Sequence, residues 1–351
     1  MKLVGSQLTE TTLRFSAPVK TAVGTLRCRP SLMLSLETET GHRAAGEASP
    51  LPGFSVETLA DVRTALEEWL PYLLRLSHHN FSTPDEIYRV VEHLGGPPSA
   101  QHAVEQALLG LLALHRGVPA ITLLSQAPTQ FVPVHRLVET PDQAIDAVQA
   151  RVGTIKVKVG AHSIKEDTDR LLAIRNAVGN SIDIRVDANG AYTFPEALQA
   201  IEGFRSANVD ALEEPIRGRD LVQLAQLRQH SPIFLLADES VRNGQDLERC
   251  IGLEAADGVV LKPMLLGGPI HSYRLAQRAI EAGLMCSVTT TFDGVLGRRS
   301  ALWVAASLPA DARLSCGLMT GRFLEDGQPE AGPVHSGAMW LPDSTIKGMG
   351  L

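Results

Sequence analysis

The stretch that decides the fold opens at residue 154 with Thr-Ile-Lys-Val-Lys-Val and reaches Asp187-Ala188-Asn189. Between these ends lie a segment of helical length, 165–178, and a second apolar run, 182–186. β-Branched residues are frequent in both runs, which is typical of two parallel strands joined by a crossover helix. The stretch therefore predicts a parallel β-sheet covered by helices.

The same alternation of apolar run and helical segment extends on both sides of this stretch. The other expected strands are 131–138, 209–212, 233–237, 258–261, 284–289 and, more weakly, 313–317. The other expected helices include 195–207, 220–230, 245–253 and 270–282. Eight strands in succession predict an α/β fold of the TIM-barrel type. A doubly wound sheet is the alternative, but no Gly-x-Gly-x-x-Gly follows the first strand.

The first hundred residues have a different pattern, in which strands precede helices. The expected strands are 13–15, 31–37 and 46–48, and the expected helices are 59–74 and 85–94. This order indicates a separate α+β domain.

The clearest break in the chain is Gly95-Gly96-Pro97-Pro98. We therefore assign residues 1–98 to the α+β domain and residues 99–320 to the barrel, which a helix over 100–115 would lead into. Residues 321–351 are rich in Gly and Pro, and we expect them to form a tail that packs back on the first domain.

Composition excludes several classes of protein. The 351 residues carry a net charge of −7, which argues against a partner such as nucleic acid or an anionic membrane. The longest apolar run, 108–114, is too short to span a bilayer, and the N-terminus lacks the apolar stretch of a secretory signal. The four cysteines are far apart, as expected for reduced thiols in a cytoplasmic protein.

A charged residue stands at the carboxyl end of five successive apolar runs. These residues are Lys158, Asp187, Glu213, Asp238 and Lys262, spaced 29, 26, 25 and 24 residues apart. Each one alone would be an ordinary strand, loop or helix-cap residue. Together they occupy the same position on neighbouring βα units, and in a barrel those positions converge on the mouth where active sites lie.

The chemistry of such a mouth follows from its charges. Three carboxylates in one cavity repel each other, and a hard divalent cation with oxygen ligands, Mg²⁺ above all, removes the conflict. A neutral lysine can remove a proton bound to carbon, and nearby positive charge lowers its pKa toward neutrality. Lys156 would supply that charge to Lys158, because residues two apart on a strand share a face.

These residues resemble the motifs of the enolase superfamily, muconate-lactonizing-enzyme subgroup. The motifs are Lys156-x-Lys158, Asp187-Ala188-Asn189, Glu213-Glu214-Pro215, Asp238-Glu239-Ser240, and Lys262-Pro263 with Gly267-Gly268. The resemblance implies a modified (β/α)7β barrel under an N-terminal α+β capping domain. It implies that Asp187, Glu213 and Asp238 bind Mg²⁺, for which Mn²⁺ can substitute, and that Lys158 and Lys262 form an acid–base pair. It gives Lys156, Asn189 and Glu239 supporting roles, with Glu239 paired to Lys262.

Within the subgroup, the stretch from Gly46 to Thr58 resembles the capping-domain loop of the o-succinylbenzoate synthases. That family dehydrates 2-succinyl-6-hydroxy-2,4-cyclohexadiene-1-carboxylate in menaquinone biosynthesis. The resemblance implies a substrate-binding lid that includes Pro52, Gly53 and Phe54, although turn chemistry alone would also explain Pro-Leu-Pro-Gly.

One segment departs from the family pattern, which after the seventh strand is similar to Ser-Ser-x-x-Glu-Ser. Here the chain reads Thr289-Thr290-Thr291-Phe292-Asp293-Gly294, and we expect Thr290, Thr291 and Asp293 to contact the substrate. Because of this departure, the motifs do not identify the substrate within the subgroup. The expected reaction is the dehydration, a carbon–oxygen lyase reaction. The alternatives are N-acylamino acid racemase, dipeptide epimerase and muconate-lactonizing activity, or a non-catalytic barrel that binds a small carboxylate. The sequence predicts no oligomeric state.

Overall fold

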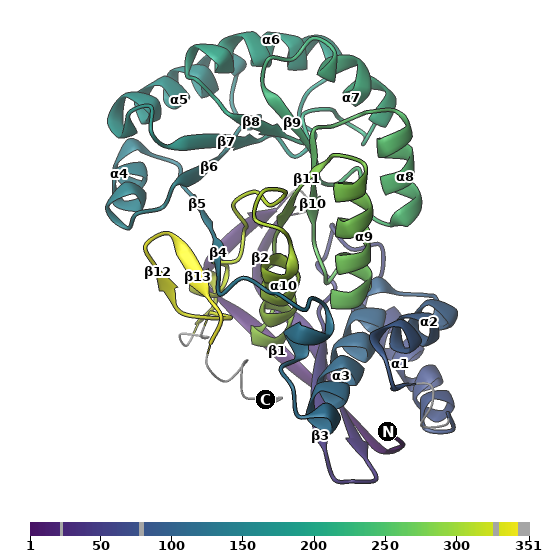
Figure 1. Ribbon diagram of the computed structural model, residues 1–351. Coiled ribbons are helices and arrows are strands. Elements are labelled where there is room, and N and C mark those ends of the chain that lie inside the picture. The colour runs from purple at the N-terminus through teal and green to yellow at the C-terminus, as the bar shows by residue number, and fades with distance from the viewer. Residues whose placement is uncertain (22–23, 77–80, 326–329, 343–351) are drawn as a thin grey trace.

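The computed structural model describes residues 1–21, 24–76, 81–325 and 330–342. It contains a three-stranded antiparallel sheet with helices packed on it, and a ring of parallel strands surrounded by helices (Figure 1). This is the expected fold class, an α/β barrel with a capping domain.

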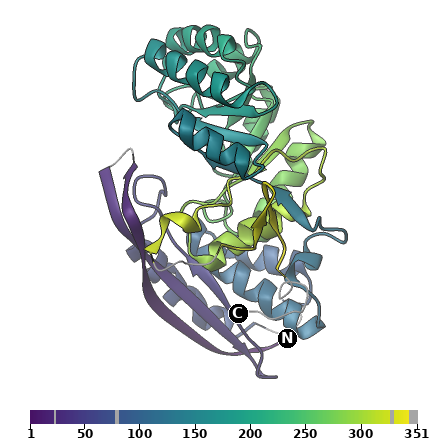
Figure 2. The ribbon, with the colours of Figure 1, turned by 90° about the vertical axis from the view of Figure 1, so that its left-hand side faces the viewer.

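The antiparallel sheet has the order β1-β2-β3, formed by β1 (Leu3–Thr21), β2 (Gly24–Thr38) and β3 (Arg43–Ala48). Figure 2 shows the long ribbons of β1 and β2 running below the barrel. Strand β1 is far longer than the expected 13–15. It buries Leu3 and Phe15 and exposes most side chains between them, so its pairing with β2 leaves little apolar pattern in the sequence.

Three helices follow this sheet: α1 (Leu59–Leu73), α2 (Pro84–Leu94) and α3 (Pro98–Arg116). Helix α3 lies directly on β3. A Cβ atom on Gly46 would be 1.9 Å from the backbone oxygen of Ala103, so only a glycine permits this approach. The expected domain boundary at residue 98 thus falls at the start of a helix that packs on the antiparallel sheet, and we propose to place it after residue 116.

The barrel begins after the short helix η2 (Ala120–Leu123). A short strand outside the ring, β4 (Phe131–Pro133), leads into it, and the barrel strands are β5 (His135–Leu137), β6 (Thr154–Lys158), β7 (Asp183–Asp187), β8 (Ala211–Glu213), β9 (Phe234–Ala237), β10 (Gly258–Leu261) and β11 (Met285–Val288). Its helices are α4 (Pro141–Gln149), α5 (Ile164–Val178), α6 (Phe194–Ser206), α7 (Leu221–Arg228), α8 (Gly244–Gly252), α9 (Pro269–Glu281) and α10 (Val295–Ser307). Strands β5 to β11 pair in sequence order, each parallel to the next.

Residues 313–317 close the ring, although they form isolated bridges and no continuous strand. On one side, the backbone nitrogen of Gly317 donates to the carbonyl of Val288 at 2.9 Å. On the other side, the nitrogen of His135 donates to the carbonyl of Cys316 at 3.0 Å. The weakest apolar run of the sequence therefore joins the two edges of the sheet.

The tail contacts both parts of the molecule. Helix η3 (Gly321–Phe323) lies against β1, where the Ser16 hydroxyl donates to the carbonyl of Phe323 at 3.2 Å. Strands β12 (Val334–His335) and β13 (Ala338–Trp340) form a small sheet with β4. The last part of the expected tail, residues 343–351, lies outside the described residues.

Two glutamates of the capping domain hold the amino ends of two barrel helices. The positions before α9 and α10 are glycines, Gly268 and Gly294, which have no side chain with which to cap a helix. Glu105 of α3 accepts hydrogen bonds from the backbone nitrogens of Ile270 and His271 in α9. Glu47 of β3 accepts from the nitrogens of Gly294 (2.6 Å) and Gly297 (2.9 Å) at α10. Both carboxylates are buried and negative groups at positive helix ends, so they fasten the two domains together.

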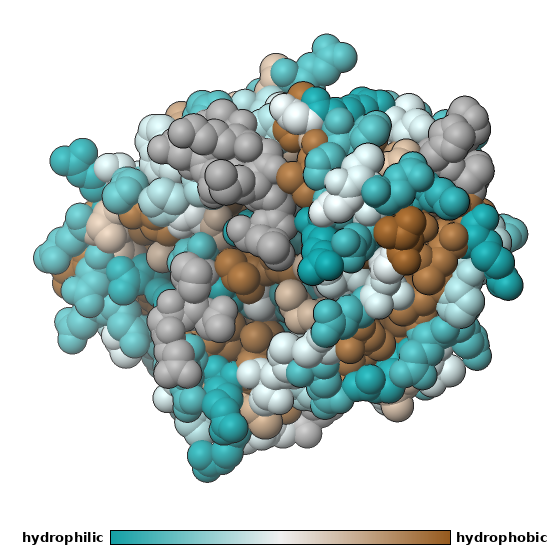
Figure 3. Space-filling view, turned by 90° about the horizontal axis from the view of Figure 1, so that it is seen from below, coloured by the Kyte–Doolittle hydropathy of each residue, from teal (hydrophilic) through white to brown (hydrophobic). Residues whose placement is uncertain are grey.

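In the described part of the chain, no helix is long and apolar enough to cross a membrane. The face seen from below shows hydrophobic patches interrupted by hydrophilic residues (Figure 3). The four cysteines are free thiols, of which Cys28 is exposed and the others are buried.

Candidate active site

The barrel brings the five charged residues found in the sequence to one end of its strands. Lys158 pairs in register with Asp187, and Asp187 with Glu213, at the last positions of β6, β7 and β8. Asp238 and Lys262 directly follow β9 and β10. The carboxyl ends of parallel strands lie at one edge, so all five side chains are placed at the barrel mouth.

Lys156 lies between two of the carboxylates. Its Nζ is 2.9 Å from Asp187 Oδ2 and 2.9 Å from Glu213 Oε1, while Lys158 Nζ is 3.0 Å from the same Asp187 oxygen. Burial alone would lower the pKa of Lys156, but Asp187 and Glu213 outweigh it and raise that pKa. The positive charge of Lys156, which we expected to act on Lys158, is therefore balanced by two anions.

Lys262 pairs with Asp238 on the opposite side of the ring. Its Nζ is 2.5 Å from Asp238 Oδ1 and 4.7 Å from the centre of the Phe54 ring, a cation–π contact. Burial and the charge of Glu239 raise the pKa of Asp238 well above its usual range.

The expected pairing of Glu239 with Lys262 takes the form of a charge interaction. Burial alone would lower the pKa of Lys262, but Asp238 and Glu239 raise it, while the hydrogen bond of Glu239 goes to another residue. Glu239 Oε1 accepts a hydrogen bond from Asn189 Nδ2 at 2.9 Å, and Lys158 Nζ donates to the amide oxygen of the same Asn189. Asn189 thus links Lys158 to Glu239. Its positive φ of 44° turns the chain there after β7.

Glu214 is a buried residue of the site whose role sequence reasoning missed. Its Oε2 accepts from the backbone nitrogens of Asp238 (2.8 Å) and Ser240 (3.2 Å), so it positions the loop that carries Asp238. Burial and the charge of Glu239 raise the pKa of Glu214 to about 7. The signal was present in Glu-Glu-Pro, but a sequence cannot tell which of two adjacent glutamates turns outward from the mouth.

The donor set of the mouth fits a divalent cation. As the side chains lie, the described residues form no cluster of three His, Cys, Asp or Glu at metal-binding spacing, because the lysine ammonium groups lie between the carboxylates. Within those residues, however, Glu213 Oε2 is buried without a hydrogen-bond partner. Glu213 also contributes to the raised pKa of Asp238, which is the repulsion that a cation would relieve. Asp187, Glu213 and Asp238 are thus suitable ligands.

A cavity of about 380 Å³ opens beside Lys262 and Asp238. Phe54 of the expected lid and Val56, which follows it in the same loop, line the cavity, as do Arg219 and Arg242 from loops at the barrel mouth. Pro52 and Gly53 belong to the same loop but are exposed and are not among the described lining residues. Of the expected lid, it is therefore Phe54 that reaches the cavity.

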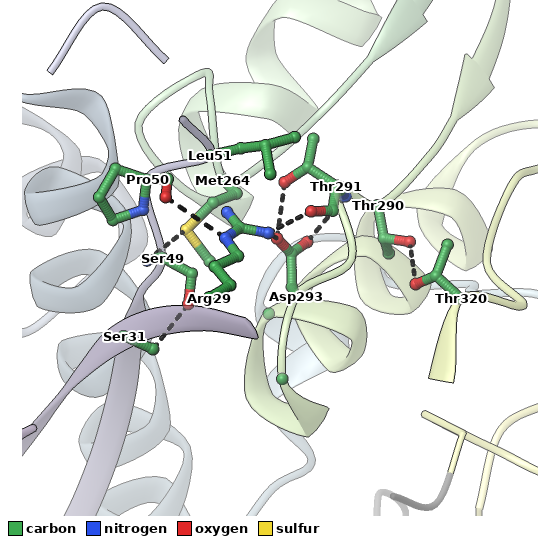
Figure 4. Close-up of polar contacts among 12 residues, drawn as sticks. Arg29, Ser31, Ser49, Pro50, Leu51, Met264, Thr290, Thr291, Asp293 and Thr320 are labelled. Carbon is green, nitrogen blue, oxygen red and sulfur yellow. Dashed lines mark hydrogen bonds and ion pairs between the residues drawn. The ribbon is translucent and has the colours of Figure 1, made fainter. Parts of the chain in front are cut away.

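Thr290, Thr291 and Asp293 lie in a buried polar cluster around Arg29 (Figure 4). Arg29 of β2 donates from Nη1 to the carbonyl of Thr291 and lies 3.3 Å from Asp293 Oδ1. Its Nε donates at 3.3 Å to the carbonyl of Pro50, at the base of the loop that carries Phe54. Thr290, Thr291 and Asp293 are not among the described residues that line the cavity. They join the lid, the capping sheet and the loop after β11.

Fold and site together define the class of protein, which is an α/β-barrel enzyme with a carboxylate and lysine site under a capping domain. The chain belongs to the enolase superfamily. Residues 5–125 match the mandelate racemase / muconate lactonizing enzyme N-terminal domain, and residues 139–351 match the enolase C-terminal domain-like family. The resemblance inferred from the motifs is confirmed at this level.

Two curated relatives and one solved structure show which activities occur on this framework. The N-succinyl-L-Arg/Lys racemase of Bacillus cereus is 27% identical over 88% of this chain and 85% of its own. The hydrophobic dipeptide epimerase of Enterococcus faecalis is 28% identical over 89% of this chain and 90% of its own. The crystal structure of the Enterococcus faecalis dipeptide epimerase with Mg and the dipeptide L-Leu-L-Tyr superposes with a TM-score of 0.87 at 25% identity. The superposition covers 97% of this chain and 98% of the epimerase chain. The finer resemblance to o-succinylbenzoate synthases stays a prediction.

Proposed function

We propose that the protein inverts the configuration of a small carboxylate at its α-carbon, with an N-acylated amino acid or a dipeptide as substrate. The observation that carries this proposal is the placement of Lys158 and Lys262. Lys158 ends β6 and Lys262 directly follows β10, and three strands lie between β6 and β10 in the ring, so the two lysines face the barrel mouth from opposite sides.

Inversion at carbon needs a base on one face and an acid on the other. One lysine, in its neutral form, removes the α-proton, and the other, as an ammonium group, returns a proton to the opposite face. Asn189 would hold Lys158 in place through its amide oxygen, and Asp238 would hold Lys262. The aromatic side chain of Phe54, which lines the cavity beside Lys262, would exclude water from the substrate.

Mg²⁺ is part of the proposal, with Asp187, Glu213 and Asp238 as its ligands. When bound, it would act as a Lewis acid toward the substrate carboxylate and so make the α-proton more acidic. The buried, unpartnered Glu213 Oε2 in the described part of the chain supports this role, as does the Mg in the Enterococcus faecalis epimerase.

Dehydration to o-succinylbenzoate is the second candidate. The resemblance of residues 46–58 to the loop of that family favours it, and Phe54 of this loop lies on Lys262. The relatives reported above are a racemase and an epimerase, and they favour the first candidate.

Exchange of the α-proton in deuterated water tests the proposal. The panel contains N-acylated amino acids, dipeptides and the cyclohexadiene substrate, each followed by ¹H NMR and polarimetry with Mg²⁺ and with EDTA. We expect Mg²⁺-dependent exchange together with loss of optical rotation for one of the first two groups. Formation of o-succinylbenzoate without exchange in the amino acid derivatives would support the second candidate, and no reaction with any of them would contradict both.

A further inference from the structure

Two arginines share the cavity with Lys262 and take no part in the proton transfer proposed above. Arg219 lies in the loop between β8 and α7, and Arg242 lies in the loop between β9 and α8. These loops follow the strands that lead to Glu213 and Asp238. Both arginines therefore line the cavity from neighbouring loops at the barrel mouth.

The described residues do not neutralise these two positive charges by an ion pair. Arg242 Nε donates at 3.3 Å to the backbone carbonyl of Glu239, and the side chain of Arg219 has no hydrogen bond or ion pair within the described part of the chain. Partial burial and the charge of Arg219 lower the pKa of Arg242, with Glu239 and Asp246 opposing that effect. Two like charges held near each other favour an anion between them.

Two other acidic groups among the described residues that line the cavity accept hydrogen bonds from backbone or hydroxyl groups and form no ion pair with either arginine. Glu57 Oε1 accepts hydrogen bonds from the nitrogen (3.2 Å) and the hydroxyl (2.7 Å) of Ser99. Asp246 Oδ2 accepts from the backbone nitrogen of Arg242 at 3.0 Å, at the start of α8. Asp238 and Glu239 belong to the site already described. Apart from Arg242 Nε, which donates to the Glu239 carbonyl, the guanidinium donors of Arg219 and Arg242 have no partner in the described part of the chain and are available to a ligand.

We propose that Arg219 and Arg242 form a subsite for a second carboxylate of the substrate, remote from the carbon that loses its proton. The proposal rests on the function proposed above and narrows it to substrates with two carboxylates. Paired guanidinium donors match the planar geometry of a carboxylate. The second carboxylate can come from an N-succinyl group or from an acidic side chain of a dipeptide, and a cavity of about 380 Å³ has the volume of a small-molecule site.

Calorimetric binding in the presence of Mg²⁺ tests the subsite without turnover. N-succinyl-L-alanine and its neutral amide, N-succinamoyl-L-alanine, differ only at the remote carboxylate. L-Ala-L-Glu and L-Ala-L-Gln form the same contrast for a side chain. We expect the protein to bind the dicarboxylate of at least one pair about tenfold more tightly than its neutral partner, as charge-assisted hydrogen bonds predict. The pair that shows the preference identifies the source of the carboxylate.

Arg219→Gln and Arg242→Gln should each remove most of this preference, whereas Arg219→Lys should keep part of it through its charge. Arg217→Gln is the matched control, because Arg217 is exposed in the same loop and is not among the described cavity residues. It should keep the full preference. Equal binding within both pairs, or a preference that both glutamine variants retain, would overturn the subsite. If the preference is found but no α-proton exchanges, the subsite stands and the proposed function fails.

Discussion

At the scale of single residues, the two lysines carry the proposed chemistry and differ in their surroundings. The Lys158 side chain is half exposed and is held by Asp187 and Asn189, while the Lys262 side chain is 12% exposed and lies between Asp238 and the Phe54 ring. The two can therefore be tested separately.

Arginine keeps the charge of each lysine but is not a base at neutral pH. We expect Lys158→Arg and Lys262→Arg each to lose racemisation by about 10³-fold, because each removes one of two proton carriers. Each variant should still exchange the α-proton of one enantiomer, which the remaining lysine can reach. NMR exchange measured on each pure enantiomer checks this.

The same two variants separate inversion from dehydration. A dehydratase can use Lys158 alone on one face, so Lys262→Arg would keep measurable dehydration while Lys158→Arg would abolish it. Far-ultraviolet circular dichroism and Mg²⁺ titration of each variant control for the bulk of arginine. Full racemisation by Lys158→Arg would remove Lys158 from the reaction.

Asp238→Asn should weaken Mg²⁺ binding by about tenfold or more, because it removes one anionic ligand from a site that binds metal through deprotonated groups. Calorimetric titration with Mg²⁺ measures the change. Asp169→Asn, on the exposed face of α5, is the control and should bind as the parent does. Equal affinity in parent and Asp238→Asn would exclude Asp238 as a ligand.

The five charged residues could be found in the sequence because each one ends an apolar run. The burial of Arg29 could not be predicted, because no local pattern marks it. From Leu32 onward, the even positions of β2 are buried in the core, and this alternation places Arg29 on the other face. Its burial comes from the loop after β11, which is 262 residues away in the chain and leaves no trace in the local pattern.

At the scale of elements, the amino ends of α9 and α10 depend on carboxylates from the other domain. Glu105→Ala should lower the free energy of unfolding by about 1–3 kcal/mol, because it leaves buried backbone nitrogens of α9 unsatisfied. Urea denaturation measures the difference. Glu68→Ala, at an exposed position of α1, is the control and should change stability by less than about 0.5 kcal/mol. Equal stability of the two variants would contradict the capping role.

The loop that carries Phe54 should govern substrate choice more than chemistry. Phe54→Ala removes apolar surface from the cavity, so we expect a raised KM, or activity shifted among substrates, with kcat for the best substrate kept within about tenfold. Steady-state kinetics on at least three substrates measure this. A uniform fall in kcat with unchanged KM would show that Phe54 acts on the chemical step instead.

Most barrel elements could be predicted because each strand is a short apolar run followed by a helix of ordinary length. The closing segment 313–317 gave only a weak pattern, since it contributes isolated bridges. Helix α3 was expected as a helix that leads into the barrel. Its packing on β3 of the antiparallel sheet was not expected, because that packing depends on the close approach at Gly46. Such tertiary contacts leave no periodic signal.

At the scale of the whole molecule, one hydrophobic core runs through both domains and includes Leu34 of β2, Leu108 of α3 and Val259 of β10. We therefore expect a single cooperative unfolding transition. Trp69 in the capping domain and Trp303 in α10 are both nearly buried and report on different parts. Variants with one of these as the only tryptophan should give superimposable fluorescence curves in urea. An earlier transition at Trp69 would mean that the capping domain unfolds by itself.

Glu47 and Glu105 also limit how this protein could exchange parts with its relatives. A chimera that takes residues 1–116 from another protein receives new side chains at both positions, while the glycines before α9 and α10 come from this chain. Such a chimera could keep apolar residues on both sides of the domain interface. The backbone nitrogens at the amino ends of α9 and α10 would still lack acceptors, unless the donor protein has carboxylates at positions 47 and 105. The two domains are therefore best exchanged together. In a library of shuffled relatives, the variants that fold should be enriched in those that carry acidic residues at both positions.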